Sequence, residues 1–132
     1  MRATGQLLLA QDAVIDLIYT SPLVRAVQTA EILAGAIGLD EPVIVKPEIA
    51  SPPTIRALVR MVEEVAGHVQ GLAVVGHEPT LSAFARALLG GGAAPAGMQK
   101  GAVLALSYAR EPKTAQFQWW IVPDGPARRD TL

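Results

Sequence analysis

Two short apolar runs, each followed at once by the signal that opens a helix, constrain the fold of this sequence more than any other feature. Ile15 to Thr20 (IDLIYT) precedes Ser21-Pro22, and Gly71 to Gly76 (GLAVVG) precedes His77-Glu78-Pro79. Compact runs rich in β-branched residues are typical of buried strands, and proline is favoured in the first turn of a helix. Strand followed directly by helix, repeated in this way, predicts an α/β fold.

The rest of the chain supplies the other elements. Ser21 is the predicted N-cap of a helix that runs to about Ile37, where Gly38 is placed to end it. Helices that alternate with continuous apolar strands favour a three-layer sandwich with a mainly parallel sheet, in a single domain over residues 1–132. The remaining expected elements are helices over Gln6 to Ala13, 55–65 after Thr54 and 79–89, strands over 43–45, 102–108 and 116–122, a proline-rich loop over 47–53, and a frayed tail after Pro123.

Composition and charge narrow the possible partners. A chain of 132 residues that is 51% hydrophobic has material for one buried core, and its net charge of −1 provides no broad positive field for nucleic acid or a membrane surface. Any anion must therefore be held locally. The absence of cysteine excludes disulfides and thiolate metal sites. No apolar stretch approaches the roughly 20 residues of a membrane span and no signal peptide is present, so we expect a cytoplasmic protein.

The two strand-to-helix junctions carry the candidate functional residues, because ligands of open α/β sheets bind beyond the carboxyl ends of the strands. Arg25 lies in the first turn of a helix, where its charge opposes the helix dipole unless an anion is bound or an acidic residue pairs with it. His77 projects from the end of the second strand, and Gly76 permits a sharp turn or the close approach of a ligand. Glu78 is either a helix-terminus carboxylate or a proton donor beside His77. His68, near the end of an amphipathic helix, is interpreted as structural.

The residues around both junctions resemble a known family. TSPLVRAVQTAEIL (residues 20–33) and VVGHEPTLS (residues 74–82) closely resemble two signature segments of the histidine phosphatase superfamily, in its branch of SixA-like phosphohistidine phosphatases. The segment GMQKGAVLAL (residues 97–106), Thr4-Gly5 and the last strand from Phe117 to Val122 also look like that branch.

The resemblance has implications for fold and site. It implies a phosphoglycerate mutase-like α/β sandwich in which Arg25 binds phosphate and His77 is the second active-site histidine, which donates to the phosphoryl group and stabilises charge in the transition state. Ser21 is a further candidate ligand of the anion. No metal and no cofactor are implied.

The sequence departs from the family at its start. Superfamily members begin with an apolar strand that ends in Arg-His-Gly, whose histidine is the nucleophile, and this sequence contains no Arg-His-Gly. In the family that strand lies inside the sheet, so its absence predicts either unpaired facing edges or a neighbour that fills the gap. Three explanations are open: residues omitted from this sequence, a truncated product, or a rearranged fold such as strand exchange in a homodimer.

Two functions follow from these observations. The first is a phosphohistidine phosphatase-like protein that hydrolyses phosphohistidine in a protein, or a small phosphoramidate or phosphoester. Because an enzyme without its nucleophile usually loses several orders of magnitude in rate, the second is a catalytically impaired pseudophosphatase that binds phosphate or a phosphoprotein. A structural remnant that binds no anion is a third alternative. The expected partner is a phosphorylated protein or small molecule, and neither nucleic acid nor a membrane.

Overall fold

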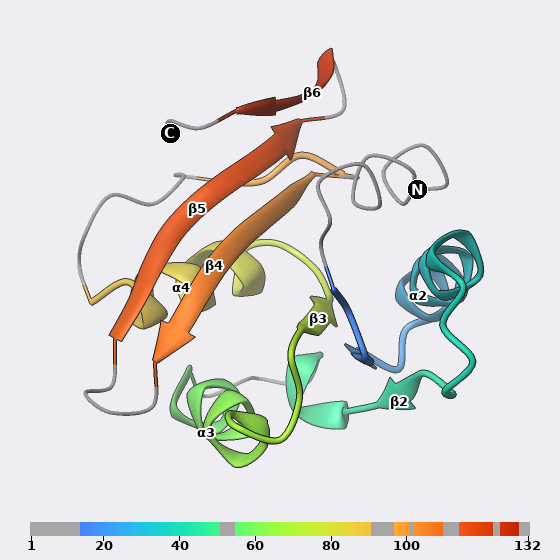
Figure 1. Ribbon diagram of the computed structural model, residues 1–132, viewed down its shortest axis with the longest axis horizontal. Coiled ribbons are helices and arrows are strands. Elements are labelled where there is room, and N and C mark those ends of the chain that lie inside the picture. Colours follow the sequence, from blue (N-terminus) through green and yellow to red (C-terminus); the bar gives the residue numbers. More distant parts are fainter. Residues whose placement is uncertain are drawn as a thin grey trace.

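A computed structural model gives the structure of residues 14–50, 55–90, 97–100, 102–109, 114–122 and 125–129. Helices and strands alternate along the first two thirds of the chain, and strands follow one another in the last third (Figure 1). In chain order they are β1 Leu17–Thr20, α2 Val24–Ile37, β2 Ile44–Val45, a 3₁₀ helix Pro47–Ile49, α3 Ile55–Val65, β3 Leu72–Val75, α4 Thr80–Leu88, β4 Val103–Ala109, β5 Thr114–Val122 and β6 Gly125–Arg129.

Strand β1 is the centre of a parallel sheet of order β2-β1-β3. Its last residue, Thr20, lies opposite Val75 at the end of β3 and opposite Val45 at the end of β2. One further hydrogen bond extends each ladder past the strands, from the Ser21 amide to the Val75 carbonyl at 3.0 Å and from the Lys46 amide to the Thr20 carbonyl at 2.8 Å. All three strands therefore end at the same edge of the sheet.

The central strand β1 is buried on both faces, which explains why its sequence is largely apolar, whereas the edge strand β2 is exposed. Ile18, which is fully buried, faces α2 and packs with Ala30 and Leu33. Its neighbour Tyr19 faces the opposite side and packs with Leu58 of α3 and Phe84 of α4 among others. Burial of one such side chain stabilises the fold by roughly 1.5–3 kcal/mol, so packing on two faces holds a strand of this length in place.

The predicted three-layer α/β arrangement with a parallel sheet is confirmed. Helix α2 lies on one side of the parallel strands and α3 lies on the other (Figure 1). None of the helices in the described ranges is long and apolar enough to cross a lipid bilayer.

The last three strands form a separate antiparallel sheet of order β4-β5-β6. It is joined to the rest by packing, since Val103 of β4 and Trp119 of β5 contact the cluster around Ile18. The prediction that the tail after Pro123 frays is wrong, because residues 125–129 pair with β5 from Trp120 to Val122. Edge pairing needs only backbone groups on one side, and the polar and proline-containing sequence of β6 suits an outer strand.

Other sequence predictions are corrected in detail. Helix α2 begins at Val24 with Leu23 as its N-cap residue and without a side-chain cap, so the assignment of Ser21 as N-cap is wrong. Gly38 does end the helix, with the left-handed φ of 72° that favours glycine. Residues 47–49 form a 3₁₀ helix inside the predicted loop. The predicted helix over 6–13, Thr4-Gly5 and Thr54 lie outside the described residues.

The sequence predicts either unpaired facing edges or a neighbouring strand in the place of the family's first strand, and the strand order of the described residues bears on both expectations. Strand β1 pairs directly with β3 over its whole length, from Leu17 opposite Leu72 to Thr20 opposite Val75. The other edge of β3 pairs with no strand in the described part of the chain.

Candidate active site

The two strand-to-helix junctions meet through a single side-chain hydrogen bond. The register that aligns Thr20 with Val75 brings the next residue of each strand end together, so Ser21 lies beside the segment that carries His77. The Ser21 hydroxyl oxygen lies 2.6 Å from Nε2 of His77. Residues 56 positions apart in the chain are thereby joined at the carboxyl edge of the parallel sheet.

Ser21 is held rigidly from several directions. Its side chain is fully buried, its amide is bonded to the Val75 carbonyl, and its carbonyl accepts a bond of 3.1 Å from the Thr20 hydroxyl. The Leu23 amide donates to the Ser21 hydroxyl oxygen at 3.4 Å. The hydroxyl therefore serves both the imidazole of His77 and the turn into α2.

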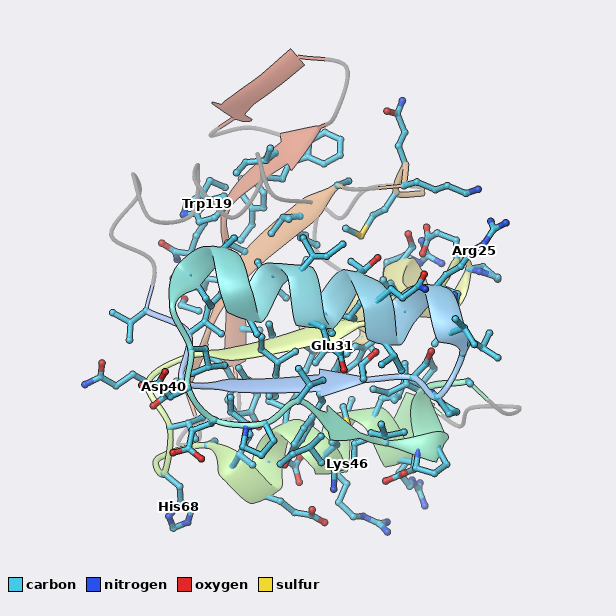
Figure 2. All side chains as sticks on the ribbon, turned by 90° about the vertical axis from the view of Figure 1, so that its right-hand side faces the viewer. Arg25, Glu31, Asp40, Lys46, His68 and Trp119 are labelled. Atoms are coloured by element: carbon cyan, nitrogen blue, oxygen red, sulfur yellow. The ribbon has the colours of Figure 1, made fainter. Side chains whose placement is uncertain are left out.

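Arg25 is the second residue of α2 and its side chain is exposed. Figure 2 shows it at the end of the molecule toward which β1 points, with its guanidinium directed outward. The first turn of α2 contains no acidic residue, and no acidic side chain in the described ranges pairs with Arg25. A cation next to the unpaired amides of a helix N-terminus is an arrangement that a bound anion would stabilise.

His77 is half-buried at the end of β3, and its carbonyl accepts the Leu81 amide at 3.0 Å. The glycine before it is required by packing. A Cβ atom on Gly76 would lie 2.7 Å from Cγ2 of Ile49 and 3.3 Å from a methyl group of Leu81. The sequence allowed for a ligand that approaches Gly76 closely. Among the described residues, the groups that approach this glycine are the side chains of Ile49 and Leu81.

Glu78 ties the start of α4 to a distant segment. One carboxylate oxygen accepts the Ser82 amide at 2.9 Å, and the other accepts the Ser82 hydroxyl and the Met98 amide, the latter at 2.7 Å. Partial burial acts to raise the pKa of Glu78, but the bonds from Ser82 and Met98 and the charge of Arg86 outweigh it and leave this pKa below its ordinary value. Its contacts are those of an ionised carboxylate at a helix terminus.

The second histidine of the chain lies elsewhere. His68 is exposed in the turn between α3 and β3. Figure 2 places it at the opposite end of the molecule from Arg25. Of the two histidines in the sequence, His77 is therefore the one at the carboxyl edge of the sheet.

Sequence reasoning missed the role of the buried serine in α4. Ser82 is almost fully buried and uses both its amide and its hydroxyl to fix Glu78. Its spacing of one helical turn from Glu78, on a helix with an otherwise apolar inner side, was the available signal. Within the described part of the chain, no three His, Cys, Asp or Glu side chains gather in a way that could hold a metal ion.

Comparison with known proteins bears on the sequence of the first part of the chain and on the fold. The family model described as the histidine phosphatase superfamily, branch 1, matches residues 1–50, which include Ser21 and Arg25. No curated protein sequence matches the chain. The resemblance to the superfamily is confirmed for residues 1–50, which hold the first of the two motifs, and residues 74–82 lie outside that match.

Solved structures of similar fold include several phosphatases. A protein histidine phosphatase SixA complexed with tungstate has a TM-score of 0.84 at 21% identity, over 93% of this chain and 78% of that one. A SixA phosphohistidine phosphatase described as putative, from Agrobacterium tumefaciens, has a TM-score of 0.70 at 21% identity, over 92% and 79%. A mycobacterial glucosyl-3-phosphoglycerate phosphatase has a TM-score of 0.64 at 18% identity, over 92% and 82%. At these identities the likeness establishes the fold.

Proposed function

We propose that the chain binds a phosphoryl oxyanion at the carboxyl edge of β1 and β3 and acts as a phosphohistidine phosphatase-like protein. Its substrate would be phosphohistidine in a protein, or a small phosphoramidate or phosphoester. The observation that supports this most is the Ser21–His77 hydrogen bond of 2.6 Å, because it joins the junction that carries Arg25 to the junction that carries His77.

Each residue has a chemical part in this proposal. Arg25 would bind two phosphoryl oxygens through its forked guanidinium, with help from the free amides at the start of α2. His77 would donate a hydrogen bond to the phosphoryl group and stabilise the charge that develops on its oxygens. We assign this proton-bearing role to His77, since Glu78 acts as acceptor in its bonds to Ser82 and Met98 and its pKa is lowered.

A second candidate function is supported by the position of His68. Formation of a phosphohistidine intermediate requires one imidazole as nucleophile, while charge stabilisation by a second is a separate role. The sequence has two histidines, and His68 lies at the far end of the molecule from Arg25. His77 is therefore the one of the two that can serve the proposed site. This arrangement favours a pseudophosphatase that binds phosphate or a phosphoprotein with little or no turnover.

Calorimetric titration with phosphate and with tungstate tests the site. We expect Arg25→Ala and His77→Ala to weaken binding by roughly tenfold or more, because each removes a charge-assisted contact. His68→Ala is the control, since this exposed side chain lies at the opposite end of the molecule from Arg25, and this variant should bind as the wild type does. Unchanged binding in both site variants would refute the proposed site.

Hydrolysis then separates the two candidate functions. The wild type is incubated with a phosphohistidine peptide, and released phosphate is measured over time. Release that is lost in Arg25→Ala and His77→Ala supports a phosphatase, whereas binding without release supports the pseudophosphatase. The phosphorylated-protein partner, the homodimer and the cytoplasmic location stay predictions from the sequence.

A further inference from the structure

We propose that Ser21 is a positioning residue that fixes the proton of neutral His77 on Nδ1, so that Nδ1–H is the donor presented to the bound oxyanion. This inference rests on the proposed function, in which His77 donates to a phosphoryl group. It adds the identity of the donating nitrogen and the residue that selects it.

The hydrogen bonds around the Ser21 hydroxyl decide the direction of its bond to His77. A serine hydroxyl has one hydrogen to donate and two lone pairs that accept. The Leu23 amide already donates to the oxygen. The hydroxyl hydrogen is then free to point along the 2.6 Å contact to Nε2, which accepts it. In a neutral imidazole one nitrogen accepts and the other carries the hydrogen, so the proton resides on Nδ1.

The reverse direction is less favourable. If Nε2–H donated to Ser21, the hydroxyl hydrogen would need another acceptor, and no other described group is bonded to this oxygen. Ser21 is fully buried, and a buried donor without a partner is costly. The observed contacts therefore select the tautomer with the hydrogen on Nδ1.

The same contacts leave Nδ1 available to a ligand. No described residue forms a hydrogen bond with it, and the imidazole is only half-buried. The Ser21 side chain is held by its full burial and by the Leu23 amide that donates to its hydroxyl oxygen at 3.4 Å, while its backbone is fixed by bonds to Val75 and to the Thr20 hydroxyl. The serine thus acts as a fixed support that holds both the orientation and the protonation of the ring.

The tautomer can be measured directly on the wild-type chain without phosphate. Long-range ¹H–¹⁵N spectra of the imidazoles, recorded at about pH 9 where histidine is normally neutral, distinguish a protonated Nδ1 from a protonated Nε2. The chain has two histidines, so exposed His68 provides an internal reference. We expect the Nδ1–H pattern for His77 and a different, solvent-like pattern for His68. An Nε2–H pattern for His77 would overturn the inference.

Variants then test whether Ser21 is the cause. Ser21→Ala should shift His77 toward the Nε2–H pattern and weaken phosphate binding about tenfold, and Ser21→Thr, which retains the hydroxyl, should restore both. Ser82→Ala is the matched control, because it removes another buried serine hydroxyl that contacts Glu78 instead of His77, and it should leave the tautomer unchanged.

Failure of this inference and failure of the proposed function give different results. An unchanged His77 pattern in folded Ser21→Ala would overturn the role of Ser21 while leaving the phosphate site intact. An Nδ1–H pattern that depends on Ser21, in a chain whose phosphate binding is indifferent to Arg25→Ala and His77→Ala, would support the tautomer assignment and refute the phosphate site.

Discussion

One side chain bridges β1 and the segment of β3 at each end of this strand pair. The two bridges differ in whether their polar atoms are all occupied. At the amino end, Asp16 accepts the Gln70 amide at 3.1 Å and the Gly71 amide at 3.0 Å. At the carboxyl end, Ser21 bonds to the imidazole of His77 at 2.6 Å. Both bridges join segments more than 50 positions apart in the chain, so both help to set the register of the same two strands.

The amino end is a closed structural clamp. Each carboxylate oxygen of Asp16 is occupied by a backbone amide, and these bonds, that from Gly71 first and that from Gln70 second, lower the pKa of Asp16 below its ordinary value. A Cβ atom on Gly71 would lie 1.7 Å from the Val14 carbonyl oxygen, so the backbone itself fills the space.

The carboxyl end is open by contrast. His77 keeps one ring nitrogen without a partner among the described residues, and Arg25 in the first turn of α2 is exposed. The comparison teaches that one kind of bridge can leave its polar atoms all occupied at one end of a strand pair and leave one available to a ligand at the other. Substitutions at the two ends should therefore separate stability from anion chemistry.

The largest effect is expected at the open end. If the wild type releases phosphate, His77→Ala should lower the rate by about 10²–10⁴, since removal of one transition-state donor or proton-transfer group has that effect in other enzymes. The free energy of unfolding should fall by about 1–3 kcal/mol, because the substitution leaves the buried Ser21 hydroxyl without its acceptor. Phosphate release and urea unfolding measure the two quantities. A large loss of stability with unchanged release would reverse the assignment of the two ends.

The next effect concerns the closed end. Gly71→Ala should destabilise the fold by about 2–4 kcal/mol, because the methyl group collides with backbone and not with a movable side chain. Gly35→Ala in α2 is the control, as nothing lies within 4 Å of its added methyl group, and alanine is the better helix former there by up to about 1 kcal/mol. Urea unfolding of both variants checks this. Equal stability of the two would show that the close contact at Gly71 is relieved without cost.

A smaller effect is expected for the clamp itself. Asp16→Ala should lower the free energy of unfolding by about 1 kcal/mol, since it deletes two charge-assisted bonds at a partly exposed position. Phosphate affinity, measured by calorimetry, should stay within about twofold of the wild type. A loss as large as that in Arg25→Ala would mean that the two ends are coupled.

The smallest effect is a pH dependence shared by both ends. The pKa values of Asp16 and Glu78 are lowered from 3.8 and 4.5 respectively, so each carboxylate stabilises the fold above its unfolded pKa. That contribution is lost as the pH falls through the lower folded value. Urea unfolding between about pH 5 and pH 2 should show stability falling with pH. The fall should be shallower in Asp16→Ala and in Glu78→Gln, and slopes equal to that of the wild type would contradict the assignment.

Local signals in the sequence were sufficient for much of the fold and for the two strand-to-helix junctions. The apolar runs, Gly38 and the helix-opening prolines each act on their own neighbours, so strands β1 and β3 and helices α2 and α4 could be placed within a few residues. The junctions that carry Arg25 and His77 were placed in the same way, whereas their chemical roles came from the resemblance to a family and stay predictions. Strand β6 was missed because its pairing depends on the free edge of β5 and not on its own composition.

Contacts between segments that are distant in the chain could not be predicted from local sequence patterns. The role of Ser21 was misassigned because its short-range pattern is that of a helix cap, whereas its hydroxyl bonds to a residue 56 positions away. The bond from the Met98 amide to Glu78 spans 20 positions and left no local trace. Each depends on strand register or on the path of a long connection.

The sequence by itself determined which residue types follow each strand: a serine and an arginine after one, a histidine and a glutamate after the other. Local backbone preferences and apolar burial are enough to place them at helix starts. Only the tertiary structure decided that Thr20 aligns with Val75, and therefore that the serine reaches the imidazole. The physical reason is that hydrogen-bond direction and ring orientation depend on distances of a few tenths of an ångström between strands, which packing on both faces of the sheet fixes.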